Sequence, residues 1–321
     1  MKKITTLPQS KHFQLVELKP GIYAAICGQR GAGIGNAGLI DLGDRVLVFD
    51  TFMTPQAAAD LLAASVALTG RRPDLVINSH YHNDHIWGNQ VFLAQALILS
   101  SEATLELILR EGQEEFDWYG ANSAGRLADL QGQYDRSEDG AGKENLAPWL
   151  DYYGGLVEAF PDLKVCPPQM TFRNHLTIHG SSRQAKLITF ENGHTGSDTI
   201  LYLPESDDEQ GTIFAADLLF VQTHPFLIEG DPLQLINILK EIEQVEFSTI
   251  VPGHGPVGTK EDIQQLIAYI QYCLQTADRL IEEGHTDEAA LAALTLPHPY
   301  DAWKIPHFFT TNISHLIKEC R

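Results

Sequence analysis

The sequence predicts an α/β (α+β) fold, in which layers of β-sheet are covered by helices. The first hundred residues alternate short apolar strands with one helix. Strand patterns return between residues 176 and 251, and a helical pattern follows residue 259. Strands and helices that succeed one another in this way are typical of layered domains with one core between the layers.

The elements of the first hundred residues are marked by turn and cap signals. Thr54 and Pro55 indicate the start of a helix that runs to about Leu68, because threonine caps helices and proline suits the first helical position. Gly70 is its expected end. A short apolar strand, 75–78, leads directly into His80. The other expected strands are 13–18, 21–27, 38–42 and 45–49.

A glycine motif, Gly33-Ile34-Gly35-Asn36-Ala37-Gly38, matches the G-x-G-x-x-G pattern of dinucleotide-binding proteins. That pattern holds a pyrophosphate only where a helix opens on its last glycine. Residues 38–49 instead predict a hairpin around Gly43-Asp44. We therefore expect no dinucleotide site.

Residues 101–165 differ in texture and are expected to form a helical insertion. Residues 105–110 continue a helical segment, and residues 120–142 are rich in Gly, Asp, Ser and Gln. Isolated aromatic residues usually serve burial, so we expect packing rather than a lid over the site, although a lid is the alternative. The aromatic residues concerned are Trp118, Tyr119, Trp149, Tyr152 and Tyr153.

The second half predicts strands followed by helices. The strands are 186–190, 199–203, 212–215 and 249–251, and the helices are 261–283 and 287–293. We expect a catalytic domain over 1–260 and a helical C-terminal extension over 261–321. Residues 297–309 are a candidate either to cover the site or to form a homodimer.

Composition limits the partners and the location. The net charge is −20, and Lys and Arg are few. Since binding a phosphate backbone needs clustered Lys and Arg, we expect a small-molecule substrate and no nucleic acid. No apolar run reaches the ~18 residues of a membrane span, and no apolar stretch follows the first lysines, so no membrane and a cytoplasmic location are expected. The cysteines are too far apart for a metal site or a disulfide framework; they are Cys27, Cys166, Cys273 and Cys320.

Four metal-binding side chains lie within six residues, directly after an apolar strand: His80, His82, Asp84 and His85. Alternation in an extended loop predicts that His80 and His82 face one side, with Asp84 and His85 turned to opposite sides of a bend. Such a segment can serve two neighbouring cations. Nitrogen and oxygen ligands suit Zn²⁺, Fe or Mn²⁺, and the lack of thiolate argues against a purely structural zinc.

Three further candidates, His194, Asp217 and His254, follow later apolar strands. Glycines flank His194 and His254, so the backbone can bend close to a cation. Taken alone, a histidine at a strand end is more often structural, and most of the other histidines lack such a context. His224 is the exception, because it follows Asp217 by seven residues and is a candidate to face the substrate.

Together these residues resemble the metallo-β-lactamase superfamily, in order and approximate spacing, from about residue 21 to residue 256. The resemblance implies an αββα sandwich of two mixed sheets with helices outside. It also implies that His80, His82 and His194 hold one cation, that Asp84, His85 and His254 hold a second, and that Asp217 bridges them. Asp50 matches an aspartate of that family that fixes the loop carrying His80 to His85, which we call the motif loop.

An aspartate at position 217 resembles glyoxalase II thioesterases and acyl-homoserine lactonases more than true β-lactamases. We expect two divalent cations, Zn²⁺ first, and a bridging hydroxide, oriented by Asp84 as the catalytic residue, that attacks an ester, thioester, lactone or lactam carbonyl. An iron-dependent oxidoreductase of the same fold and a β-lactamase proper are the alternatives, together with a site that binds without turnover.

Overall fold

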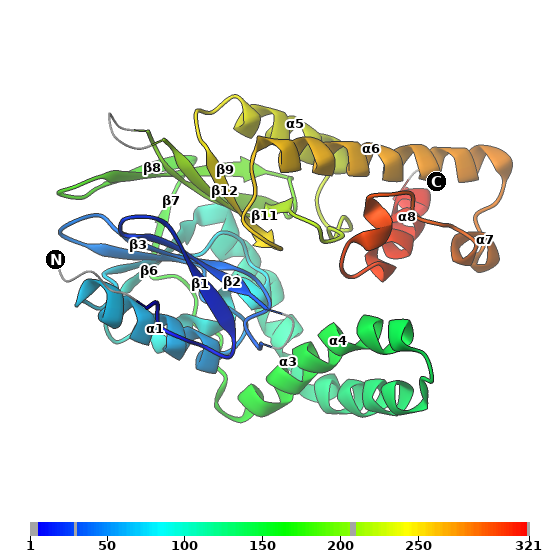
Figure 1. The fold of residues 1–321 in the computed structure, drawn as a ribbon, viewed down its shortest axis with the longest axis horizontal. Helices are drawn as coiled ribbons and strands as arrows, with labels where there is room; N and C mark the ends of the chain where they lie inside the picture. The colour runs from blue at the N-terminus through cyan, green and yellow to red at the C-terminus, as the bar shows by residue number, and fades with distance from the viewer. Residues whose placement is uncertain (1–5, 29–30, 206–209, 320–321) are drawn as a thin grey trace.

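Two mixed β-sheets lie face to face with helices outside them (Figure 1). The computed structural model describes residues 6–28, 31–205 and 210–319. The two-sheet arrangement confirms the predicted four-layer sandwich.

The first sheet has seven strands in sequence order, antiparallel from β1 to β4 and parallel from β4 to β7. Helix α1 (Pro55–Thr69) covers its outer face. The Thr54 side chain caps α1, and Gly70 ends it with a φ of 74°, as predicted. The strands are β1 (Phe13–Lys19), β2 (Ile22–Cys27), β3 (Ala37–Asp41), β4 (Val46–Phe49), β5 (Leu75–Ile77), β6 (Leu97–Ser101) and β7 (Met170–Phe172).

The second sheet has five strands in the order β12-β11-β10-β9-β8, and only β11 and β12 run parallel. Its strands are β8 (His175–His179), β9 (Gln184–Glu191), β10 (Ser197–Leu203), β11 (Thr212–Phe220) and β12 (Thr249–His254). Helices α5 (Pro232–Glu243) and α6 (Lys260–Glu283) cover its outer side. Helices α7 (Glu288–Ala292) and α8 (His307–Glu319) lie beyond the end of the sheet, beside the far part of α6.

An apolar layer between the sheets fixes how far apart they lie. Phe49 of β4 meets Phe214 of β11 with ring centroids 6.1 Å apart. Gly38 has room for no side chain, because a Cβ there would lie 2.6 Å from the Phe214 ring. Separate apolar clusters attach α1 to the first sheet, and α5, α6 and α8 to the second.

The insertion is a hairpin of two helices, α3 (Glu102–Arg136) and α4 (Gly140–Ala159), followed by a 3-10 turn (Phe160–Asp162). Helix α3 continues through residues 120–136, well beyond the helical segment 105–110 that the sequence indicated. Its aromatic rings pack on one another and on Trp87, which follows the motif loop. Trp149 of α4 also reaches His307 and Phe308 of α8, with ring centroids 4.9 and 6.1 Å away.

The structure corrects one predicted boundary and adds a helix. Strand β11 runs to Phe220, so Asp217 lies within a strand that was expected to end at residue 215. Helix α5 was not predicted at all. The glycine motif leads into the β3–β4 hairpin and not into a helix, which confirms the predicted hairpin. The domain boundary after residue 260 stays a prediction.

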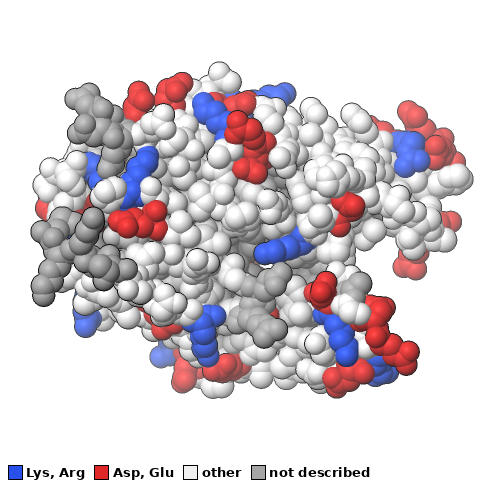
Figure 2. All heavy atoms as spheres, in the orientation of Figure 1, with Lys and Arg blue, Asp and Glu red and all other residues white. Residues whose placement is uncertain are grey.

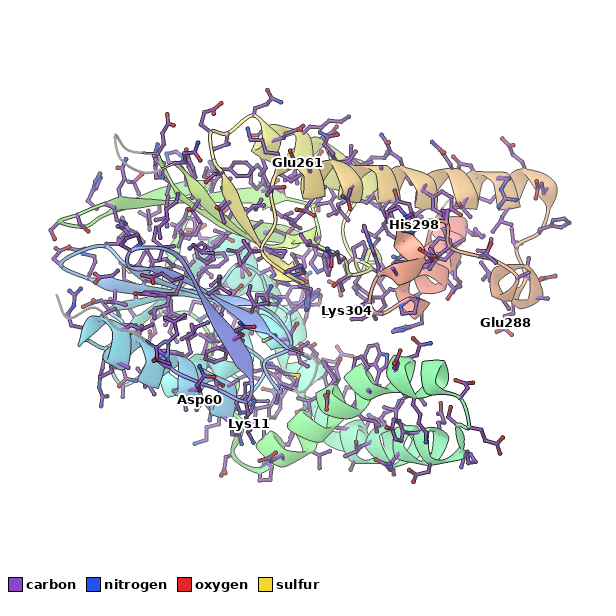
Figure 3. All side chains as sticks on the ribbon, in the orientation of Figure 1. Lys11, Asp60, Glu261, Glu288, His298 and Lys304 are labelled. Carbon is purple, nitrogen blue, oxygen red and sulfur yellow. The ribbon has the colours of Figure 1, made fainter. Side chains whose placement is uncertain are left out.

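The C-terminal segment joins the end of β11 through backbone hydrogen bonds. Lys304, labelled in Figure 3, accepts from the His224 amide and donates to the Gln222 carbonyl, both at 3.0 Å. Acidic side chains gather at the far ends of the α3–α4 hairpin and of α6 and α7 on the face in Figure 2. None of the described helices is both long and apolar enough to cross a membrane.

Asn36 connects the two sheets at the end where the polar loops meet. Its side-chain amide donates to the carbonyls of Pro252 and Gly255, both at 2.9 Å, and its oxygen accepts from the Cys27 amide at 2.9 Å. Asn36 is 4% exposed, so water cannot replace these bonds.

We predict that Asn36→Ala lowers the free energy of unfolding by about 2–4 kcal/mol, because it leaves buried polar groups unpaired. Urea-induced unfolding followed by circular dichroism measures the change. The control is Asn122→Ala, since that amide donates to the Trp118 carbonyl of its own helix; it should cost no more than about 0.5 kcal/mol. Equal effects of the two substitutions would contradict the prediction.

Candidate metal centre

Loops from both sheets meet at one end of the sandwich and carry the seven predicted ligands. The first sheet supplies the loop after β5, where His80 and His82 precede the single helical turn α2 (Asn83–Ile86). The second sheet supplies the remaining three. His194 lies between β9 and β10, Asp217 lies in β11, and His254 is the last residue of β12.

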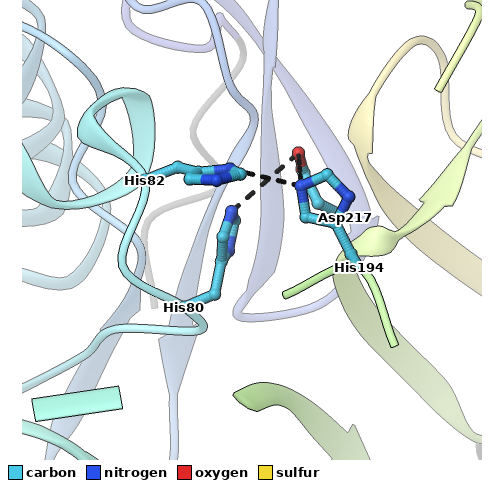
Figure 4. Close-up of side chains that lie close together, drawn as sticks. All are labelled: His80, His82, His194 and Asp217. Atoms are coloured by element: carbon cyan, nitrogen blue, oxygen red, sulfur yellow. Dashed lines mark hydrogen bonds and ion pairs between the residues drawn. The ribbon is translucent and has the colours of Figure 1, made fainter. Parts of the chain in front are cut away.

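A first group combines His80, His82, His194 and Asp217, with one ligand atom from each within 4.8 Å of the others. Figure 4 shows the three imidazoles pointing toward the carboxylate. His194 Nε2 lies 3.2 Å from His82 Nδ1 and 3.3 Å from Asp217 Oδ2. His80 Nε2 lies 3.9 Å from the same carboxylate oxygen.

A second group combines Asp84, His85 and His254, again within 4.8 Å. Asp84 Oδ2 lies 3.6 Å from His85 Nε2 and 3.3 Å from His254 Nε2. The expectation that Asp84 and His85 turn to opposite sides is therefore wrong. They lie on a helical turn, where adjacent side chains are about 100° apart instead of alternating.

Asp217 stands between the two groups. Its Oδ1 lies 3.1 Å from His85 Nε2, and its Oδ2 lies 3.3 Å from His254 Nε2 as well as from His194 Nε2. One carboxylate thus faces imidazoles of both groups. This is the placement that a bridging ligand requires.

Burial and mutual charge divide the histidines into two kinds. Burial, reinforced by the neighbouring histidines, holds the pKa of His80 well below its usual value, and burial lowers that of His194 to about 4. Burial also opposes charge on His85 and His254, but the carboxylates around them raise both pKa values. His254 and His85 in turn hold the pKa of Asp217 well below its usual value, against the effect of burial.

Several polar atoms fit the presence of cations. Among the described residues, His80 Nε2, His85 Nε2 and Asp217 Oδ1 are buried and make no well-aligned hydrogen bond, although the last two atoms lie 3.1 Å apart. Buried polar atoms without partners are rare in folded proteins. Two nitrogens bound about 2.0–2.1 Å from a tetrahedral zinc lie about 3.3 Å apart, close to the 3.2 Å between His82 and His194. The donor set, nitrogen and carboxylate oxygen, suits a divalent cation.

The backbone approaches the two groups so closely that side chains are excluded. A Cβ at Gly253 would lie 1.8 Å from Asp217 Oδ1, and one at Gly35 would lie 2.7 Å from the His85 ring. Gly35 belongs to the glycine motif, which therefore forms a wall of this site. Ala216 has a φ of 46°, at an irregularity in the β11–β12 pairing that directs the next residue, Asp217.

Asp50 fixes the motif loop through contacts with two of its residues, Ser79 and His85. Its carboxylate accepts from the Ser79 amide at 2.8 Å and the Ser79 hydroxyl at 2.7 Å, and lies 2.9 Å from His85 Nδ1. Such outer partners fix the orientation and tautomer of a ligating histidine. The structure thus places Asp50 where the family resemblance implied.

Sequence reasoning missed the groups that reach the motif loop from distant segments. Glu229 lies 3.0 Å from His82 Nε2 and accepts from the Tyr81 hydroxyl at 2.6 Å. Burial, offset in part by His82, raises the pKa of Glu115 to about 7, and Glu115 accepts from the Asn83 side chain at 3.0 Å. Neither glutamate belongs to a motif, so no local signal marks it.

His224 does not face the site. It is fully buried, its Nδ1 lies 2.8 Å from the Tyr269 hydroxyl, and its Nε2 lies 3.1 Å from the Tyr300 carbonyl. Burial lowers its pKa to about 4. It is a packing residue beneath the C-terminal helices, and its nearness to Asp217 in sequence was misleading.

A two-sheet sandwich with histidines and aspartates at one end defines a class of metal-binding folds. The chain belongs to the metallo-beta-lactamase superfamily, whose family model matches residues 30–254. Two curated relatives are hydroxyacylglutathione hydrolases, from Nostoc sp. (30% identical over 115 residues) and Cyanothece sp. (27% over 113 residues). Each match spans 32% of this chain and 44% of the relative.

Solved structures share the fold at low sequence identity. A metallo-beta-lactamase from Pontibacter korlensis aligns with a TM-score of 0.57 and 14% identity, covering 81% of this chain and 99% of that one. The stereoselective inverting sec-alkylsulfatase Pisa1 from Pseudomonas sp. aligns with a TM-score of 0.62 and 16% identity, covering 96% of this chain and 50% of that one.

We predict that Gly253→Ala weakens metal binding about 10- to 100-fold, because the new methyl group displaces the Asp217 carboxylate. Chelator competition with Zn²⁺ measures the affinity, and a thermal melt checks the fold. Gly125→Ala is the control, since a Cβ there meets nothing within 4 Å; it should leave metal binding unchanged. Unaltered zinc affinity in Gly253→Ala would refute the contact as the cause.

Proposed function

We propose that the protein is a hydrolase that holds two divalent cations and cleaves a small-molecule carbonyl compound. Zinc is the cation we propose first, because the donor set consists of imidazole nitrogens and carboxylate oxygens. The observation that carries this proposal is the position of Asp217 between two groups of ligand atoms. His80, His82 and His194 would hold one cation, and Asp84, His85 and His254 the other, with Asp217 shared.

Bound cations would supply Lewis acidity and lower the pKa of a bound water toward about 7. The protein's own residues do the positioning. Asp84 has a side chain 12% exposed, against 4% for Asp217. It is therefore the carboxylate that solvent and substrate reach, and the one able to accept a proton from an attacking water. Asp217 and Asp50 stay inside and hold the histidines in place.

The carbonyl class of the substrate rests on the comparisons and on the aspartate at position 217. The two curated relatives are named for hydrolysis of a hydroxyacylglutathione thioester. Their similarity supports a thioester or ester first, with lactones and lactams next. Phe226, whose ring centroid lies 6.4 Å from that of His82, and Phe308, which contacts Phe226, place apolar rings beside the first group of ligands.

The test is a panel of thioesters, esters, lactones and β-lactams, with metal content measured on the same preparation. We expect zinc-dependent hydrolysis that stops on chelation and returns with zinc. Asp84→Asn should lower kcat/KM about 100- to 10,000-fold, the usual worth of a positioned acid or base. The control, Asp278→Asn on the exposed side of α6, should retain full activity.

Two results would overturn the proposal. Full hydrolysis with both groups of ligands emptied of metal would exclude the cations from the reaction. Iron in the purified protein together with oxygen uptake, and no hydrolysis, would assign an oxidoreductase instead. Hydrolysis of β-lactams alone would keep the reaction and change the substrate.

A further inference from the structure

Glu229 holds His82 from the side opposite the metal groups. His82 Nδ1 faces His194 Nε2 at 3.2 Å, inside the first group, while its Nε2 lies 3.0 Å from Glu229 Oε2. An imidazole that ligates through one nitrogen carries its proton on the other. The carboxylate of Glu229 is the acceptor for that proton.

Glu229 is itself fixed by a second donor. The Tyr81 hydroxyl donates to the same oxygen, Oε2, at 2.6 Å. Tyr81 directly precedes His82, so one carboxylate oxygen binds two consecutive side chains of the motif loop. A free glutamate side chain has several rotatable bonds, and two bonds to one oxygen reduce that freedom.

The loop that carries Glu229 is anchored at both ends. Asn312 of α8 is fully buried, donates to the Pro225 carbonyl at 2.8 Å and accepts from the Leu227 amide at 3.0 Å. On the other side, a Cβ at Gly230 would lie 2.0 Å from the Gly193 carbonyl oxygen. The loop is therefore packed between the C-terminal helix and the segment that bears His194.

We infer that Glu229 is a positioning residue that fixes the tautomer and the ring orientation of His82, so that Nδ1 is presented to a cation. This inference rests on the proposed function, because it assumes that the first group takes up metal. It assigns to the C-terminal helix α8 an indirect part in the site, since Asn312 holds the loop from which Glu229 projects.

The test compares Glu229→Ala and Glu229→Gln in the full-length protein. Chelator competition with Zn²⁺ should show affinity about 10- to 100-fold weaker in Glu229→Ala, the usual effect of losing an outer partner of a ligand. Glu229→Gln should recover most of the affinity, because an amide oxygen still accepts from Nε2. Glu191→Ala, which removes a carboxylate from the same surface hollow, should match the wild type.

A spectroscopic measurement separates positioning from general damage. In the zinc-loaded protein labelled with ¹⁵N-histidine, NMR should show His82 protonated on Nε2 in the wild type and in Glu229→Gln. In Glu229→Ala that signal should broaden or disappear through exchange with water.

The possible failures are distinguishable. If the wild type binds no zinc, the proposed function fails and this inference fails with it. If the wild type binds zinc but Glu229→Ala binds it as tightly, with the same His82 tautomer, only the inference on Glu229 is overturned. A change in KM alone, with zinc affinity unchanged, would overturn it too and place Glu229 against the substrate.

Discussion

A buried carboxylate surrounded by imidazoles is the constraint on which this structure depends. Asp217 is 4% exposed, and burying an unpaired charge is expensive. The pKa values of His85 and His254 rise beside it, so protons on these histidines can offset the charge. Cations held by the same histidines would offset it in place of those protons. Position 253 is a glycine because its backbone lies too close to the Asp217 carboxylate for a side chain to fit.

The same carboxylate explains why two sheets are needed. The motif loop leaves the first sheet after β5, whereas Asp217 and His254 belong to adjacent parallel strands of the second. The distance between the motif loop and these two ligands is set by the apolar layer between the sheets and by Asn36, which forms hydrogen bonds across that layer. A small shift of one sheet would move four ligands relative to the other three, so rigidity between the layers is a condition for the site.

The sequence predicted the site well where the ligands lie in short, recognisable segments. The cluster from His80 to His85 and the glycine-flanked His194 and His254 predicted which side chains would gather, because each follows an apolar strand. Alternation failed at Asp84 and His85, since a single helical turn replaced the extended loop. Glu229 was invisible, because only the folded chain brings it beside a residue 147 positions away. Helix α3 was underestimated because its outer half is polar.

Contacts from three directions hold the motif loop. They give the α3–α4 insertion and the C-terminal helices a common role. Asp50 binds Ser79 and His85 from the sheet below. The insertion reaches the side chain of Asn83, between two predicted ligands, and the loop anchored by α8 reaches His82. A loop that must present four ligands at once has too few internal contacts to fix itself. The insertion and the C-terminal helices therefore supply the rigidity that the ligand geometry requires.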